Sequence, residues 1–291
     1  MLAHRSAPSG PVAPMARADV TAPMARAEAP APSARSRGTK PAAAAMPRHV
    51  GVIIDGNRRW AKQRGLSTAE GHRAGARKIT EVLEWCDEEG IELATIWMLS
   101  TDNTNRSAEE LTALTGIIVD AVTDITERGF RARIIGDPTV LGADAAARID
   151  RAVNSAASSS AASSSAAAVS TADDTTRRLE VDLAVGYGGR AEIMRAVRAA
   201  VAQQTDHGLS AEDALAALTV EQVSDHLFTA GQPDPDLIIR TSGEMRLSGF
   251  LMWQSAHTEF VFTSTLWPDF SRADLEAALA DYAQRDRRFG A

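Results

Sequence analysis

The chain has 291 residues, of which 44% are hydrophobic, and its formal net charge is -7 at pH 7. This hydrophobic content is enough for a sizeable core, and the sequence has no apolar run long enough for a membrane-spanning helix. The acidic balance argues against nucleic acid as the main partner, because nucleic-acid affinity depends largely on basic groups that neutralise phosphates.

The first 46 residues are mainly alanine, proline, serine and arginine, with hardly any aromatic or branched apolar residues. Such a segment cannot bury enough apolar surface to offset the entropy of ordering, so we expect residues 1–46 to be a disordered tail. An alternative hypothesis is that Met46 is the true first residue. The folded domain is then expected at residues 47–291. The single cysteine, Cys86, cannot form an internal disulfide, which fits a cytoplasmic location.

The first predicted strand, residues 50–54, ends at Asp55 and leads through a Gly-Asn turn into a basic segment with helical character. Ligands of parallel sheets bind beyond the carboxyl ends of the strands. One carboxylate, a flexible turn and the adjacent Arg58 and Arg59 therefore suit a metal-chelated polyphosphate. A purely structural Asp-Gly turn is the alternative, because short motifs often match by chance.

Four more strands follow in the predicted pattern, at residues 93–99, 131–136, 179–185 and 236–240. Helices are predicted between them, at residues 68–89, 107–128, 143–153, around 193–197 and 221–228. This alternation predicts a single α/β domain with a mostly parallel central sheet flanked by helices on both faces. The alanine- and serine-rich residues 155–174 are expected to be a flexible insertion.

The second predicted strand also leads into polar side chains, those of Ser100, Thr101, Asp102, Asn103 and Arg106. Together with the strand that ends at Arg240, three of the predicted strands thus end in groups suited to anions or metals. Turn chemistry alone does not easily explain this repetition.

The strand predicted at residues 236–240 ends at Arg240. Arg246 and Ser248 follow it in one predicted loop-to-helix segment. Guanidinium groups present fixed forks of donors that match oxygen-rich anions, so two arginines and a hydroxyl could hold one diphosphate. Downstream, Glu259 opens a further apolar run and places a second carboxylate at a strand edge. Weak surface salt bridges are the alternative explanation of these charges.

Six segments together resemble the cis-prenyltransferase family, which includes undecaprenyl diphosphate synthases and short-chain Z-farnesyl diphosphate synthases. They are HVGVIIDGNRRWA at 49–61, GHRAG at 71–75, STDNTNR at 100–106, GYGGR at 186–190, RTSGEMRLSGFLMWQ at 240–254 and EFVFTSTLWPDF at 259–270. The resemblance covers about residues 47–290, with the motifs in the family's order. It implies an isoprenyl transferase that condenses isopentenyl diphosphate with an allylic diphosphate to give a new cis double bond.

The resemblance also implies roles for individual residues. Asp55 matches the family's essential aspartate, which handles the magnesium diphosphate, and Glu259 matches a second Mg²⁺ ligand that can come from a partner subunit. The allylic diphosphate site is matched by Gly56, Asn57, Arg58, Arg59, Trp60 and His72. The isopentenyl diphosphate site is matched by Arg240, Arg246 and Ser248. Further substrate-binding candidates are Ser100, Thr101, Asp102, Arg106 and Leu247.

Two residues bear on the proton transfer and on product length. Asn103 matches an asparagine that is sometimes described as the proton acceptor, but an amide is a very poor base, so a positioning role is expected. Met98 stands where long-chain enzymes of the family have a small residue. A bulky side chain there favours a short product of about fifteen carbons, although methionine is more often simple core filling.

The resemblance further implies Mg²⁺ as cofactor, a homodimer, a cytoplasmic enzyme and a product that partitions into membranes. Two alternatives within the family are a long-chain undecaprenyl or decaprenyl diphosphate synthase and a non-catalytic partner subunit. Such subunits lose the first-strand aspartate, whereas Asp55 is present. A trans-type prenyl synthase would need DDxxD motifs, and Asp173 and Asp174 do not form one. A nucleotide-binding α/β enzyme is a further alternative, but no G-x-G-x-x-G follows the first predicted strand and the sequence has no G-x-x-x-x-G-K-[ST].

Overall fold

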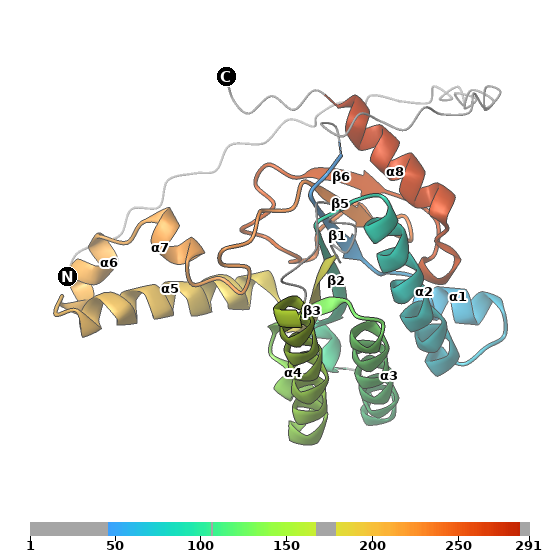
Figure 1. The fold of residues 1–291 in the computed structure, drawn as a ribbon, viewed down its shortest axis with the longest axis horizontal. Helices are drawn as coiled ribbons and strands as arrows, with labels where there is room; N and C mark the ends of the chain where they lie inside the picture. Colours follow the sequence, from blue (N-terminus) through green and yellow to red (C-terminus); the bar gives the residue numbers. More distant parts are fainter. Residues whose placement is uncertain (1–45, 106, 167–178, 286–291) are drawn as a thin grey trace, which may run out of the picture. The chain divides into compact units, whose positions relative to one another are not determined.

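The computed structural model describes residues 46–105, 107–166 and 179–285 (Figure 1). Six parallel strands form one sheet in the order β3-β4-β2-β1-β5-β6. The strands are β1 (His49–Ile53), β2 (Leu93–Ser100), β3 (Arg131–Gly136), β4 (Glu180–Tyr187), β5 (Leu237–Arg240) and β6 (Glu259–Phe262). The prediction of an α/β domain with a parallel sheet is thus confirmed.

The chain starts in the middle of this sheet, at β1, and adds β2, β4 and β3 on one side and β5 and β6 on the other. The carboxyl end of β1 therefore lies beside the point where the strand order reverses. In open parallel sheets, ligands bind at such a point.

Eight α-helices occur in the described residues. They are α1 (Asn57–Gln63), α2 (Thr68–Glu88), α3 (Ala108–Glu127), α4 (Ala143–Ala166), α5 (Gly189–Asp206), α6 (Ala211–Ala216), α7 (Val220–Ser224) and α8 (Arg272–Gln284). Short 3₁₀ segments lie at η2 (Thr101–Asn105), η3 (Pro138–Leu141) and η4 (Trp267–Asp269).

The largest core packs α2, α3, α4 and α8 onto one face of the sheet, through residues such as Val52, Leu83, Ile118 and Leu279. On the opposite face the sheet contacts Phe250 and Leu251, which belong to the connection between β5 and β6. Helix α5 packs instead on α6 and α7. One face is therefore covered largely by a loop, because this loop brings its own large apolar side chains.

The helix starts follow local capping chemistry. Ser67 and Glu70 form a reciprocal capping box at the start of α2, and the Ser107 side chain accepts a hydrogen bond from the Glu110 N–H at the start of α3. Gly90 has a φ of 77° just after α2, where an L-residue would be strained. These boundaries agree with the sequence to within one or two residues.

Several expectations are wrong in detail. The second face of the sheet is covered largely by a loop instead of by helices, and α7 ends at Ser224 instead of Phe228. Helix α4 continues to Ala166 instead of ending near Val153, because alanine has the highest helix propensity and lengthens the helix into the expected insertion. Residues 241–254 form turns instead of leading into a helix. Ser242, Ser248 and Leu251 have positive φ values of 76°, 53° and 42°, which a helix does not allow.

Residues 1–45 of the tail expected at 1–46, Arg106, and residues 167–174 of the expected insertion lie outside the described residues. Asp173 and Asp174 do so as well. Within the described part of the chain, no helix is both long and apolar enough to cross a membrane.

Candidate active site

The site begins at the carboxyl end of β1, where every residue of the strand is buried and the chain emerges at Asp55. Three hydrogen bonds with Thr241 and Trp267 fix the Asp55 backbone. Its N–H donates to Thr241 Oγ1 (2.9 Å), and its carbonyl accepts from Thr241 Oγ1 (2.6 Å) and from the Trp267 N–H (3.1 Å). Thr241 and Trp267 follow β5 and β6, so the turn after β1 is held by both strands on that side.

The Asp55 carboxylate faces two arginines. Oδ2 accepts a hydrogen bond from Arg240 Nη2 at 3.0 Å, and Oδ1 lies 3.7 Å from Arg59 Nη2. Arg240 is buried, and its Nη1 also donates to Ser248 Oγ (2.9 Å) and to the Arg246 carbonyl. Its Nε has no hydrogen-bond partner among the described residues. A buried donor without a partner is costly and often marks a functional site.

Arg59 connects the start of α1, just after the turn that follows β1, to the segment after β5. Its guanidinium donates to the Ser242 carbonyl (3.1 Å) and to Ser242 Oγ (2.5 Å), and it lies 3.9 Å from Glu244 Oε1. Ser242 adopts its positive φ at this contact. The guanidinium of Arg59 is therefore largely engaged by the protein itself.

Asn57 is positioned by the close approach of α1 to α2. A Cβ atom added at Gly75 would lie 2.8 Å from Asn57 Nδ2 and closer still to Oδ1. One added at Gly71 would overlap the Asn57 carbonyl. The two glycines of the GHRAG segment therefore make room for Asn57, whose buried Oδ1 has no hydrogen-bond partner among the described residues.

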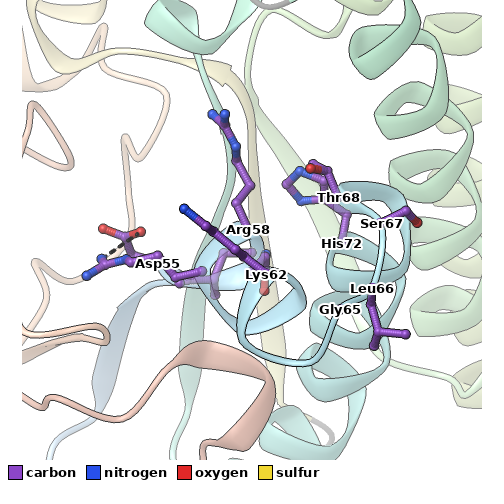
Figure 2. A pocket seen from close by; sticks show the side chains of 12 residues that line it. Asp55, Arg58, Lys62, Gly65, Leu66, Ser67, Thr68 and His72 are labelled. Atoms are coloured by element: carbon purple, nitrogen blue, oxygen red, sulfur yellow. Dashed lines mark ion pairs between the residues drawn. The ribbon is translucent and has the colours of Figure 1, made fainter.

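A cavity of about 850 Å³ opens between the turn after β1 and the start of α2, and we call it the basic cavity (Figure 2). Its wall carries both acidic and basic groups, and Figure 2 shows Arg58, Lys62 and His72 around it. It is lined by Ile54, Asp55, Gly56, Asn57, Arg58, Arg59, Lys62, Gly65, Leu66, Ser67, Thr68 and His72.

A second space of about 300 Å³, the central cavity, lies beside it and shares Asp55, Asn57 and His72 with it. Its lining includes Ile53, Trp97, Met98, Ser100, Asp102, Asn103, Leu114, Arg240 and Ser248. The pairing of β2 with β4 shifts register around Leu99, next to Met98. Such a shift changes the direction of neighbouring side chains.

A third space of about 700 Å³, the α5 cavity, adjoins the central cavity through Asp102 and Ser248. It is lined by Thr101, Asp102, Gly188, Gly189, Arg190, Ala191, Leu247, Ser248, Gly249 and Met252. Because neighbouring spaces share lining residues, the three cavities adjoin one another in series, and Asp55 and Arg240 both line the central one.

A buried network supports the wall of the α5 cavity. The Glu192 carboxylate accepts hydrogen bonds from Tyr187 Oη (2.5 Å), the Phe228 N–H (2.9 Å) and Gln254 Nε2 (3.2 Å). Burial and the nearby Glu192 charge raise the pKa of Tyr187, so its hydroxyl stays a donor. The network joins β4 and α5 to the loop that carries Leu247 and Ser248.

Helices α1, α2 and α3 meet at a weaker polar contact. Glu110 Oε1 of α3 lies 3.5 Å from His72 Nε2 of α2 and 3.9 Å from Arg58 Nε of α1. The His72 side chain is thereby held against both the basic and the central cavity.

The structure brings most of the predicted site residues to these cavities. They are Asp55, Gly56, Asn57, Arg58, Arg59, His72, Met98, Ser100, Thr101, Asp102, Asn103, Arg240, Leu247 and Ser248. Arg106 lies outside the described residues.

Three predicted residues lie elsewhere. The Trp60 ring packs 4.4 Å from the Arg64 guanidinium, and its Nε1 donates to Asp269 Oδ1 at 2.7 Å. The Arg246 side chain is exposed and pairs with Glu244, and only its carbonyl reaches Arg240. Neither side chain lines a cavity described above.

Glu259 also lies apart from Asp55. It opens β6 opposite Leu237, the first residue of β5, whereas Asp55 follows the last residue of β1. Its Oε2 accepts a hydrogen bond from Arg285 Nη1 at 2.6 Å. One chain therefore does not bring the two predicted Mg²⁺ ligands together.

Several lining residues were not predicted from the sequence. In the basic cavity, Lys62 near the end of α1 and Leu66 and Ser67 in the segment between α1 and α2 look like ordinary surface residues. Arg190 of the GYGGR segment lines the α5 cavity, and Thr241 holds Asp55. Both segments had been recognised as motifs, which was the only signal for these residues.

Comparison with known proteins gives consistent matches. A family model described as "Putative undecaprenyl diphosphate synthase" matches residues 53–168 and 158–290. The chain is 46% identical over 252 residues to (2Z,6E)-farnesyl diphosphate synthase of Mycolicibacterium smegmatis, covering 85% of this chain and 89% of that protein. It is also 46% identical to short-chain Z-isoprenyl diphosphate synthase of Mycobacterium leprae, covering 84% and 88% of the two chains.

A solved structure shows the same fold. It is that of lavandulyl diphosphate synthase from Lavandula x intermedia in complex with dimethylallyl diphosphate, with a TM-score of 0.72 and 36% identity. The match covers 85% of this chain and all of the plant chain.

Proposed function

Because the chain belongs to the undecaprenyl diphosphate synthase family of cis-prenyltransferases, we propose that it condenses isopentenyl diphosphate with an allylic diphosphate at the three connected cavities. It is a prenyl-transferring enzyme whose relatives, at 46% identity, are named as short-chain Z-prenyl synthases. The proposed product is a short Z-prenyl diphosphate of farnesyl length.

The observation that carries this proposal is the Asp55–Arg240 pair at the centre of the connected cavities. Two diphosphate substrates must meet with their reacting carbons close together and their charged groups apart. The pair lines the central cavity, which shares Asp55 with the basic cavity and Ser248 with the α5 cavity, so two separate spaces are available for the two diphosphates. Such an arrangement suits a two-substrate condensation better than the hydrolysis of one substrate.

We assign the allylic diphosphate to the basic cavity, where Asn57, Arg58 and His72 bind it. The diphosphate of isopentenyl diphosphate binds near Arg240 and Ser248, with Leu247 beside it. The allylic carbon–oxygen bond breaks with its electron pair going to the departing diphosphate. The double bond of isopentenyl diphosphate then forms the new carbon–carbon bond, and a proton leaves to the released diphosphate. Guanidinium and imidazole groups stabilise the charge that develops on the leaving group.

Mg²⁺ fits this site. In phosphate-transfer sites it is usually held by one or two carboxylates together with substrate phosphates, and the Asp55 carboxylate lies on the cavity wall. When bound, Mg²⁺ would offset the negative charge of the diphosphate. Asp55 would hold it, while Arg240 and Arg59 keep the carboxylate in place.

Glu259 can act as a metal ligand only if it comes from a second copy of the chain, because within one chain it lies at the other end of the sheet. We therefore propose a homodimer in which one protomer's Glu259 approaches its partner's site. A cytoplasmic location is part of the same proposal. Asn103, whose N–H donates to Ser100 Oγ at 3.2 Å, would position the substrate rather than accept the proton.

Met98 and Leu114 line the central cavity, which we propose as the compartment for the growing hydrocarbon chain. Its volume of about 300 Å³ leaves little room for a long product. Met98→Ala should therefore lengthen the product distribution, which mass spectrometry of the extracted prenyl diphosphates would show. An unchanged distribution would mean that Met98 is only core filling.

The decisive experiment incubates the purified chain with Mg²⁺, isopentenyl diphosphate and C5, C10 or C15 allylic primers, and sizes the products. We expect short Z-products with the native chain. We expect no product with Asp55→Ala, at unchanged thermal stability. Long products would indicate a long-chain synthase, and no elongation with any primer would leave the role of a non-catalytic subunit. Full activity of Asp55→Ala would overturn the assignment.

A further inference from the structure

Among the described residues, one cation in the lining of the basic cavity forms no ion pair with an acidic side chain. Among the cations that line it, Arg59 contacts Asp55, Ser242 and Glu244, and Arg58 lies 3.9 Å from Glu110. Lys62 has no acidic side chain within 4.0 Å in the described part of the chain. Lys78 provides a contrast, because it forms an ion pair with Glu81 at 2.5 Å.

Lys62 also shares a helix face with Arg58. The two residues are four positions apart on α1, so their side chains are neighbours, and like charges at this spacing destabilise a helix. Figure 2 shows both side chains extending from α1 over the basic cavity. A pair of cations that repel each other and face one cavity is stabilised when an anion binds there.

The negative charge expected in this cavity requires cations that the protein does not already engage. The allylic diphosphate is a multiply charged anion, and Asp55 adds a negative charge to the same wall. Arg59 is largely engaged by Asp55 and Ser242. Arg58 and Lys62 are therefore the positive groups most available to the substrate. An ammonium on a flexible stem can follow a phosphate that moves as it leaves, since it needs no fixed geometry.

We propose that Lys62 is a further binding residue for the diphosphate of the allylic substrate. The proposal rests on the function assigned above. The alternative role is structural, because Lys62 lies in the last turn of α1, where a cation interacts favourably with the helix dipole. The two roles differ in what they affect: substrate affinity in one case and only stability in the other.

The test compares Lys62→Met with Lys62→Arg and with Lys78→Met, which removes a lysine that already has an acidic partner and lines none of the cavities above. Binding is measured by titration calorimetry with an allylic thiodiphosphate, in which sulfur replaces the bridging oxygen and slows ionisation. KM is measured separately for the allylic substrate and for isopentenyl diphosphate. Thermal unfolding is followed for each variant.

For Lys62→Met we expect the Kd of the thiodiphosphate and the allylic KM to rise about tenfold, as for the loss of one charge-assisted contact. The KM of isopentenyl diphosphate should stay unchanged. Lys62→Arg should recover most of the affinity, and Lys78→Met should bind normally. Wild-type affinity for the thiodiphosphate in Lys62→Met, or a Lys62→Met effect that appears only in thermal stability, would overturn the proposal.

An Arg58→Met variant separates this inference from the function on which it rests. If Arg58→Met weakens thiodiphosphate binding and Lys62→Met does not, the role of Lys62 is wrong and the allylic site stands. If neither variant changes binding, the assignment of the basic cavity to the allylic diphosphate is itself wrong.

Discussion

The two ends of the parallel sheet differ in how completely their buried polar groups are hydrogen-bonded. At the amino end, His49 is fully buried, and both ring nitrogens have partners, the Pro233 carbonyl and Thr95 Oγ1, each at 2.8 Å. Asp236 Oδ2 accepts hydrogen bonds from the backbone N–H groups of Arg48 and His49. The polar groups here are satisfied by the protein itself, and they hold β1 beside the segment before β5.

At the carboxyl end, polar groups are buried without full satisfaction. Arg240 Nε and Asn57 Oδ1 have no partner among the described residues, and Ser242 and Ser248 have positive φ values. Natural proteins accept such costs mainly where a ligand binds. The comparison indicates that the amino end contributes stability and the carboxyl end contributes binding. Variants at the amino end should therefore lose stability, and variants at the carboxyl end should lose activity.

The largest effect is expected for Arg240→Met. The change removes the buried partner of Asp55 and the contact to Ser248, so we expect kcat/KM to fall about 10³-fold, as for the loss of one preorganised charge-stabilising group. Steady-state kinetics with both substrates would measure this. Arg131→Met is the control, because Arg131 pairs with Glu180 at the surface and such pairs contribute little. Near-normal kinetics of Arg240→Met would place the reaction elsewhere.

Gly75→Ala should cause the next largest loss at the carboxyl end. The added methyl group would overlap the Asn57 side chain, which lines both the basic and the central cavity. We expect kcat/KM to fall by about 100-fold, of the order seen when a misplaced group disturbs substrate positioning. The higher helix propensity of alanine offsets part of the cost of this overlap, so the loss of stability should be small compared with the loss of activity.

Gly116→Ala is the matched control for this change. Gly116 lies within α3, and an added Cβ there would meet nothing within 4 Å. The free energy of unfolding of the Gly116→Ala variant should rise by about 0.5–1 kcal/mol, and its kcat/KM should stay unchanged. If Gly75→Ala retains normal kcat/KM, the fit of Asn57 against α2 is not important for catalysis.

Much of the fold follows from local sequence. The buried strands appear as apolar runs. Ser67 and Ser107 mark helix starts because their side chains accept a hydrogen bond from a nearby backbone N–H, and Gly90 marks a helix end through its positive φ. Helix α4 is longer than the sequence predicts, because the low complexity of the tract after Val153 indicates flexibility whereas its alanines favour helix. Local rules predict elements well where capping or periodicity is specific.

The basic cavity was largely predictable, because its lining comes from one stretch of chain, residues 54–72. The α5 cavity combines residues 101–102, 188–191 and 247–252, and only the fold brings these together. The motifs indicated which segments matter, but not which side chain of each segment turns inward. Trp60 and Arg246 were assigned to substrate sites and instead pack on Arg64 and Glu244.

At the amino end, Asp236→Ala should change stability and leave the chemistry intact. It removes an acceptor for the N–H groups of Arg48 and His49, and we expect the free energy of unfolding to fall by about 2 kcal/mol. Urea unfolding monitored by fluorescence would measure this. The kcat/KM of the folded fraction should match the native enzyme. A large kinetic defect at normal stability would contradict the proposed division between the two ends of the sheet.

The smallest effect is a pH dependence that originates at His49. Burial lowers the pKa of His49 to about 4, and the Pro233 carbonyl and the Asp236 charge oppose this only in part. Because its pKa is lower in the folded than in the unfolded state, the unfolded chain binds the extra proton as pH falls below the ordinary histidine value. This residue should therefore reduce the free energy of unfolding by about 1 kcal/mol between pH 7 and pH 5.5. Urea unfolding at both pH values, repeated with His49→Gln, would isolate the contribution. If His49→Gln loses as much stability as the native chain over this range, another group is responsible, and the amino end of the sheet is not the origin of the acid sensitivity.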